Sequence, residues 1–147
     1  MKKIIFVCYG NICRSPMAEF LFKNMAGDRF KITSAATSDE EEGNPVHYGT
    51  RRILDRFSID YCAFRAHQLT KKECDAADYI IGMEASNVSA IKRICGRENE
   101  KKVFRLLDFS ARPRDIADPW YTHDFETTYI EISEGLDGFM RFLRDKE

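Results

Sequence analysis

The sequence predicts an α/β fold: a three-layer, doubly wound sheet of four parallel strands with helices on both faces. The first observation is that short apolar runs typical of buried strands alternate with segments of helical apolar spacing. This alternation favours a parallel sheet, because each crossover helix packs on one face of it. The second is that 147 residues with 44% hydrophobic content suffice for one domain. No linker or repeat divides the chain, so we expect a single domain over residues 1–147.

The elements of the first half follow from local signals. Ile4-Ile5-Phe6-Val7 predicts a first strand over residues 3–7. Pro16 suits the first turn of a helix, since its missing N–H would lack a partner there anyway, and Gly27 suits the helix end. These signals predict a helix over 16–26, a second strand over 30–34, a polar loop over 36–44 and a helix over 45–57.

The second half continues the alternation. Residues 59–68 lack a regular pattern, and a long connection with two prolines spans residues 108–122. Between and after them, apolar spacing predicts a short helix over 71–76, a buried strand over 78–83, a helix over 86–95, a fourth strand over 102–106 and a final helix over 124–143.

The loop after the first strand carries the most informative chemistry, a C-x5-R pattern in Cys8-Tyr9-Gly10-Asn11-Ile12-Cys13-Arg14-Ser15-Pro16. Backbone N–H groups of such a loop can converge on a tetrahedral anion, and the helix start adds its positive dipole end. The same field favours a thiolate nucleophile at Cys8. Arg14 can bind two phosphate oxygens with its planar guanidinium. The carboxyl ends of parallel strands are also where such folds bind ligands.

Composition narrows the classes of partner. The net charge of −1 comes from 23 basic and 24 acidic residues spread along the chain. We therefore expect neither nucleic-acid nor membrane binding. We see no signal peptide or long apolar run, so we expect a cytoplasmic protein. Five cysteines without a C-x-x-C pair argue against a disulfide scaffold and a zinc site, and the three histidines lack ligand spacing. We expect no metal and no cofactor.

The chain resembles the low-molecular-weight protein tyrosine phosphatases over nearly its whole length. The resemblance rests on the decorated Cys8 loop and on Asp118-Pro119-Trp120-Tyr121. Weaker matches are Ser34-Ala35-Ala36-Thr37-Ser38, Gly43-Asn44-Pro45 and Gln68-Leu69-Thr70. The family fold is a small doubly wound sheet of four parallel strands, in agreement with the residue pattern.

The resemblance implies a role for each matching residue. Cys8 would take the phosphoryl group, Arg14 would hold the phosphate, and Asp118 would serve as general acid and then general base. Ser15 matches the hydroxyl that assists the departing sulfur, and Asn11 and Ser34 match residues that hold the loop in shape. The implied partners are a phosphotyrosine protein or peptide as substrate and inorganic phosphate as product. The remaining expected substrate- or phosphate-binding residues are Tyr9, Gly10, Ile12, Cys13, Glu40, Trp120 and Tyr121.

The chain departs from the family in two places. Many members carry an aromatic residue where this chain has Glu40, within the acidic run of residues 39–42. An acidic pocket wall would favour substrates with basic neighbours; a solvated loop tip is the other interpretation. Many members also have a histidine before Gln68, where the match falls at Phe64 and His67 lies nearer.

Cys13 has two interpretations. It could form a reversible disulfide with an oxidised Cys8, or it could be a small buried residue under the loop. We interpret Cys62, Cys74 and Cys95 as structural. We expect a monomer.

Three other functions stay open at this point. A related protein arginine phosphatase would carry a small threonine at the position of Ile12, whereas a larger apolar side chain suits an aromatic ring. An arsenate reductase needs two further cysteines that relay a disulfide outward from Cys8. A non-catalytic phosphate-binding module would not need both Cys8 and Asp118.

Overall fold

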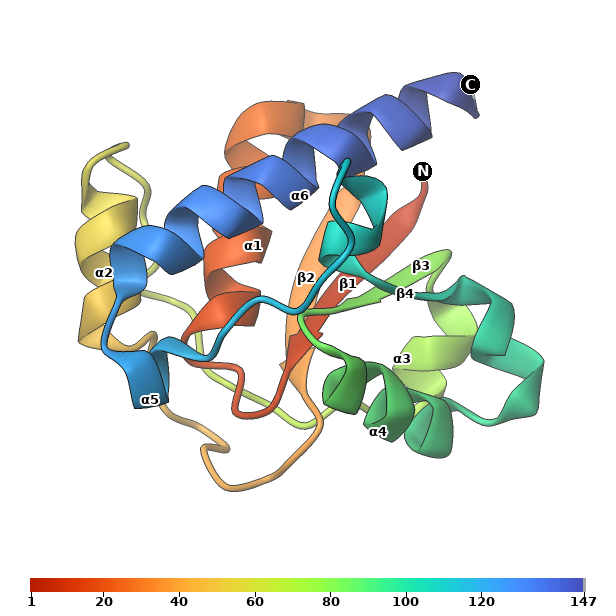
Figure 1. Ribbon diagram of the computed structural model, residues 1–147. Helices are drawn as coiled ribbons and strands as arrows, with labels where there is room; N and C mark the ends of the chain where they lie inside the picture. Colours follow the sequence, from red (N-terminus) through yellow and green to blue (C-terminus); the bar gives the residue numbers. More distant parts are fainter. Residues whose placement is uncertain (147) are drawn as a thin grey trace.

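The computed structural model describes residues 1–146 and contains the predicted parallel sheet (Figure 1). The strand order is β2-β1-β3-β4, and all three pairings are parallel. The strands are β1 (Lys3–Cys8), β2 (Lys31–Ala36), β3 (Tyr79–Gly82) and β4 (Val103–Arg105). Since β2 and β3 flank β1 on opposite sides, the chain reverses its direction of travel across the sheet beside β1. Ligands of open α/β sheets bind at such a reversal, outside the carboxyl ends of the strands.

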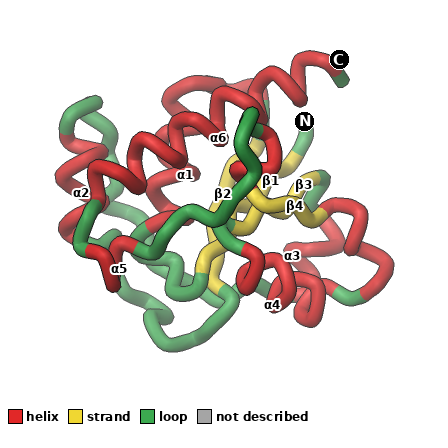
Figure 2. The backbone as a smooth tube through the Cα atoms, in the orientation of Figure 1, coloured by secondary structure: helices red, strands yellow, loops and turns green. Residues whose placement is uncertain are grey.

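Helices cover both faces of the sheet, as predicted. Figure 2 places the long carboxyl-terminal helix and the first helix on one side of the strands, with a second pair of helices on the other. The first group is α1 (Arg14–Ala26), α2 (Tyr48–Asp55) and α6 (Phe125–Asp145), and the second is α3 (Lys71–Ala76) and α4 (Ala85–Cys95). None of these helices within residues 1–146 is long and apolar enough to cross a membrane.

Strand β1 separates two hydrophobic clusters because its side chains alternate between the faces. Ile4, Phe6 and Cys8 pack in the cluster with α1 and α6. Ile5 and Val7 pack in the cluster with α3 and α4. Cys8 ends the strand on the α1 face, from which the chain turns directly into the loop that precedes α1.

Two regions differ most from the sequence prediction, while the bounds of the other predicted helices and strands shift by at most two residues. The helix expected over 45–57 begins only at Tyr48, because the His47 side chain caps it by accepting a hydrogen bond from the Gly49 N–H at 3.1 Å. The connection expected over 108–122 contains the short helix α5 (Pro119–Thr122), which Asp118 caps. Within residues 1–146, three 3-10 segments complete the fold: η1 (Gly27–Arg29), η2 (Arg97–Lys102) and η3 (Leu106–Phe109).

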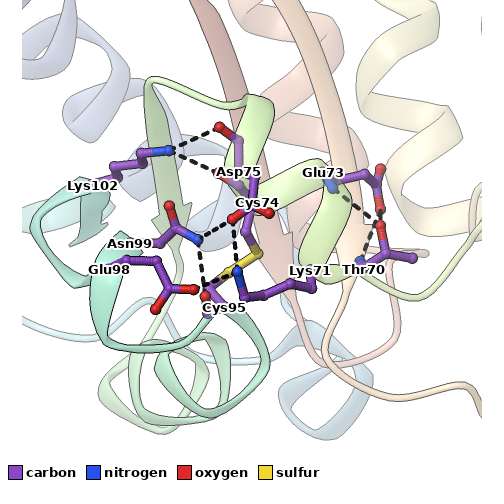
Figure 3. Close-up of a disulfide and its surroundings, with 9 residues drawn as sticks. All are labelled: Thr70, Lys71, Glu73, Cys74, Asp75, Cys95, Glu98, Asn99 and Lys102. Carbon is purple, nitrogen blue, oxygen red and sulfur yellow. Dashed lines mark hydrogen bonds and ion pairs between the residues drawn. A yellow bond between two sulfur atoms is a disulfide. The ribbon is translucent and has the colours of Figure 1, made fainter.

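A disulfide joins Cys74 of α3 to Cys95 of α4, with 5.5 Å between their Cα atoms (Figure 3). Their separation of 21 residues gives no sequence signal for this pairing. Around it, Lys102 Nζ donates to the Cys74 carbonyl at 3.0 Å, and Asn99 donates to the Cys95 carbonyl at 2.9 Å. Both cysteines are fully buried on the sheet face away from Cys8.

Candidate active site

The loop from β1 to α1 wraps around the Cys8 sulfur. The backbone N–H groups of Asn11 and Ser15 lie 3.3 and 3.4 Å from this sulfur, and the Ser15 hydroxyl lies 3.0 Å from it. Cys8 is 3% exposed. Donors directed at one sulfur stabilise negative charge on it, and α1 begins at Arg14, so the positive end of its dipole adds to the effect.

Asn11 fixes the shape of the loop. Its backbone is left-handed, with φ of 59°, a conformation that costs a non-glycine residue about 1 kcal/mol. Its side-chain amide donates to the Ser15 hydroxyl at 2.8 Å and to the Ser34 hydroxyl at 3.0 Å. Its amide oxygen accepts from the His67 N–H at 3.2 Å. Buried hydrogen bonds from three segments of the chain therefore offset the strain.

Arg14 lies at the pocket floor with 1% of its surface exposed. Nη1 donates to the Ile116 carbonyl at 2.8 Å, and Nη2 lies 3.3 Å from carboxylate oxygens of both Glu84 and Asp118. Its buried Nε–H has no hydrogen-bond partner among residues 1–146. Burying a charged donor without a hydrogen-bond partner costs free energy. Such an unpartnered donor at a pocket is typical of a group that binds a ligand.

Asp118 and two aromatic residues form another part of the pocket. Asp118 Oδ1 accepts from the Trp120 N–H at 3.0 Å, so the cap of α5 fixes the carboxyl beside Arg14. Trp120 and Tyr121 are exposed, at 51% and 78%. Large exposed aromatic side chains at a pocket mouth can contact the ring of a substrate.

The pocket has a volume of about 140 Å³ and brings together most of the predicted site. Three of the predicted residues are not at its wall. Asn11 and Ser15 contact the Cys8 sulfur from within the protein, and Ser34 accepts a hydrogen bond from Asn11. The wall consists of Cys8, Tyr9, Gly10, Ile12, Cys13, Arg14, Glu40, Glu41, Asp118, Trp120 and Tyr121.

Cys13 is 4% exposed and packs with Ile12 and Ala66. Burial, and then the nearby Cys8, raise the pKa of the Cys13 thiol far above its usual range. Cys13 is therefore a protonated thiol at neutral pH, which is a poor nucleophile.

Outer contacts support the site: the sequence gives no sign of Glu84 and Glu19, whereas the family resemblance points to the segment with Phe64 and His67. Glu84, which precedes α4, pairs with Arg14, and Glu19 accepts from the Ser34 hydroxyl at 2.6 Å. His67 contributes its backbone N–H to Asn11, and Phe64 packs beside Ile12. Glu19 is buried on α1, and its partner Ser34 lies 15 positions away, so no local pattern marks it. For Glu84 no local signal exists, because its partner is 70 positions away.

Comparisons with known proteins identify the family. A family model described as low molecular weight phosphotyrosine protein phosphatase matches residues 3–147. The low molecular weight protein-tyrosine-phosphatase YfkJ of Bacillus subtilis is 35% identical, over 100% of this chain and 99% of the relative. PtpA of Staphylococcus saprophyticus, which bears the same family name, is 38% identical over 97% and 94% of the two chains.

Solved structures of similar proteins indicate the same family. The crystal structure of YfkJ matches with a TM-score of 0.95 at 35% identity, covering 100% of this chain and 97% of that one. The low molecular weight protein tyrosine phosphatase SP-PTP from Streptococcus pyogenes matches with a TM-score of 0.89 at 41% identity, covering 97% and 93%. The chain belongs to the low molecular weight phosphotyrosine protein phosphatase family, as its sequence motifs indicated.

Proposed function

We propose that this protein is a cysteine-dependent protein tyrosine phosphatase that hydrolyses phosphotyrosine through a phosphocysteine intermediate. The main support is the geometry of one pocket. The Cys8 sulfur, which two backbone N–H groups and the Ser15 hydroxyl surround, lines the same pocket as the buried Arg14 guanidinium and the Asp118 carboxyl group, which lie 3.3 Å apart. A nucleophile, a phosphate-binding cation and a proton donor are the parts that this chemistry requires.

In the first step, the Cys8 thiolate attacks phosphorus, and the bond from phosphorus to the tyrosine oxygen breaks. Asp118 donates its proton to the departing phenolate oxygen. Arg14 binds the equatorial phosphoryl oxygens, for which its unpartnered Nε–H is available. The products are tyrosine and a phosphoryl group covalently bound to the Cys8 sulfur.

In the second step, Asp118, now a carboxylate, takes a proton from water as the water oxygen attacks phosphorus. The bond from phosphorus to sulfur breaks, and the Ser15 hydroxyl, 3.0 Å from the sulfur, stabilises the thiolate that leaves. Inorganic phosphate is released, and both groups return to their starting protonation states. The cycle uses no cofactor. We propose that the enzyme is cytoplasmic and acts as a monomer.

Two observations favour this reaction over its alternatives. Ile12 places an apolar side chain in the pocket wall, where it suits a tyrosine ring better than a guanidinium. Cys74 and Cys95 lie buried on the opposite sheet face, so they cannot relay a disulfide from Cys8 as an arsenate reductase requires.

The test compares initial rates on phosphotyrosine, phosphoarginine and phosphoserine peptides, with arsenate reduction measured alongside. We expect turnover of phosphotyrosine only, abolished in Cys8→Ser while phosphate binding persists, and loss of both in Arg14→Ala. Preference for phosphoarginine, or arsenate reduction coupled to a thiol donor, would replace the proposed substrate. Turnover that survives in Cys8→Ser would exclude the proposed nucleophile.

A further inference from the structure

The pocket wall contains two carboxylates that the proposed mechanism does not use. They are Glu40 and Glu41, in the segment that connects β2 to α2. Their neighbours Asp39 and Glu42 do not line the pocket. Glu40 lies against the Tyr9 hydroxyl and, as a hydrogen-bond acceptor, raises the Tyr9 pKa. Glu41 packs against Gly10, where the missing side chain leaves room: an added Cβ would lie 3.3 Å from Glu41 Cγ.

Hydrogen bonds hold the segment of residues 38–43 beside the pocket. The Ser38 N–H donates to the Tyr9 carbonyl at 3.1 Å, and the Gly43 N–H donates to the Ala66 carbonyl at 2.8 Å. The Glu42 carboxylate accepts from the Gln68 N–H at 2.8 Å. Glu42 therefore anchors the segment, and Glu40 and Glu41 are held at the mouth rather than on a free loop tip.

The charges of the pocket wall are unequal. Arg14 is its one cation, buried at the floor where the phosphate binds, and its carboxylates are Glu40, Glu41 and Asp118. Asp118 acts on the leaving oxygen. The two glutamates thus face whatever part of the substrate surrounds the aryl phosphate. Acidic groups there would add repulsion, and basic groups would form ion pairs at a partly exposed rim.

We propose that Glu40 and Glu41 select phosphotyrosine peptides that carry lysine or arginine next to the phosphotyrosine and disfavour those with aspartate or glutamate there. This inference rests on the proposed phosphotyrosine activity and adds the substrate class. For exposed pairs of this kind we expect about a two- to fivefold effect on kcat/KM per contact at low ionic strength.

The experiment measures kcat/KM on two phosphotyrosine peptides of equal length, one with lysine and arginine flanks and one with aspartate and glutamate flanks. Each rate is divided by the rate on para-nitrophenyl phosphate, which has no flanks. The enzymes are wild type, Glu40→Gln/Glu41→Gln and the control Asp39→Asn, which removes a neighbouring charge outside the pocket wall.

We expect wild type and Asp39→Asn to prefer the basic peptide, and the preference to fall toward one in the double variant and at high salt. Equal wild-type rates, or a preference that survives in Glu40→Gln/Glu41→Gln, would overturn the inference. An equal loss of the preference in Asp39→Asn would also overturn it, because the net charge of the protein would then explain the preference. Absence of Cys8-dependent para-nitrophenyl phosphate turnover would instead contradict the proposed function itself.

Discussion

At the scale of single residues, the site depends on Asn11. Its left-handed backbone lets its own N–H point at the Cys8 sulfur, while its side chain bonds Ser15 and Ser34. Ser15 in turn contacts the same sulfur, so one polar network positions both the nucleophile and the group that assists its departure. Strain of this kind is typical of functional sites, where surrounding contacts over-determine the conformation.

Asp118 allows a direct test at this scale. Its carboxyl is held by the Trp120 N–H beside Arg14, in position to protonate a leaving oxygen. In Asp118→Ala we expect kcat on phosphotyrosine to fall about 100-fold or more, the usual contribution of a general acid. With an activated leaving group such as para-nitrophenolate, the first step should be much less affected, because that oxygen leaves without a proton.

The measurement is a single-turnover comparison of aryl phosphates with leaving groups of different basicity. Wild type should depend weakly on leaving-group basicity, and Asp118→Ala should depend on it steeply. Parallel dependence in the two enzymes would remove Asp118 from this role.

At the scale of elements, His47 connects α2 to the site. Its side chain caps α2 through the Gly49 N–H, and its ring stacks on Phe125 at a centroid distance of 5.2 Å. Burial, and then the nearby Arg51, lower the His47 pKa from its usual value. A protonated ring could not accept the Gly49 hydrogen bond through Nδ1, so protonation also removes the cap.

The pH dependence of stability follows from this direction. Since the folded His47 pKa lies below the unfolded value of about 6.5, the unfolded chain takes up the proton first as the pH falls. Neutral His47 therefore contributes to the free energy of unfolding above about pH 6.5. This contribution is lost as the pH falls through the pKa of His47 in the folded protein. In His47→Asn, asparagine keeps a capping oxygen and does not titrate.

Urea unfolding at a series of pH values tests this expectation. Wild type should lose more free energy of unfolding between neutral and mildly acidic pH than His47→Asn does, so the difference between the two proteins should shift in favour of His47→Asn on acidification. Curves that stay parallel would mean that His47 makes no pH-dependent contribution.

The helix α6 illustrates what a pattern of apolar residues leaves out. Its apolar spacing predicts a long helix, which the structure confirms over Phe125–Asp145. Gly135 and Gly138 look like weak helix formers in the sequence. In the structure, a Cβ at Gly138 would lie 2.1 Å from the Phe109 carbonyl oxygen, and one at Gly135 would lie 2.5 Å from Leu106 Cγ. The glycines let η3 approach α6 closely, a long-range requirement that local periodicity does not contain.

At the scale of the whole molecule, the parallel sheet with helices on both faces follows from the alternation of patterns alone, because few topologies satisfy it. The Cys8 loop is equally local, since its donors and its nucleophile are neighbours in sequence. The role of Asp118 could be predicted only from the family resemblance, because Asp118 and Arg14 are more than 100 positions apart in the sequence and meet only in the folded chain. The pairing of Cys74 with Cys95 and of Arg14 with Glu84 depends on how distant helices meet, which no local signal encodes.

The Cys74–Cys95 disulfide affects stability rather than chemistry. Closing a loop with a separation of 21 residues in the unfolded chain stabilises the folded state by about 3 kcal/mol. We expect a reductant to lower the free energy of unfolding by about this amount and to leave kcat unchanged, because the bond lies on the face away from Cys8. Cys74→Ala/Cys95→Ala should not respond to reductant. A wild-type urea midpoint that reductant does not move would contradict this contribution.

The proposed mechanism requires the Cys8 sulfur to carry the phosphoryl group during turnover. Acid quenching of Asp118→Ala during hydrolysis of para-nitrophenyl phosphate, followed by mass spectrometry of the digested protein, tests it most directly. This variant forms the intermediate with an activated leaving group but lacks the base that activates water, so the intermediate should accumulate. We predict one added phosphoryl group on the peptide that contains Cys8. Turnover without any modified peptide, or a phosphoryl group on a different residue, would contradict the account.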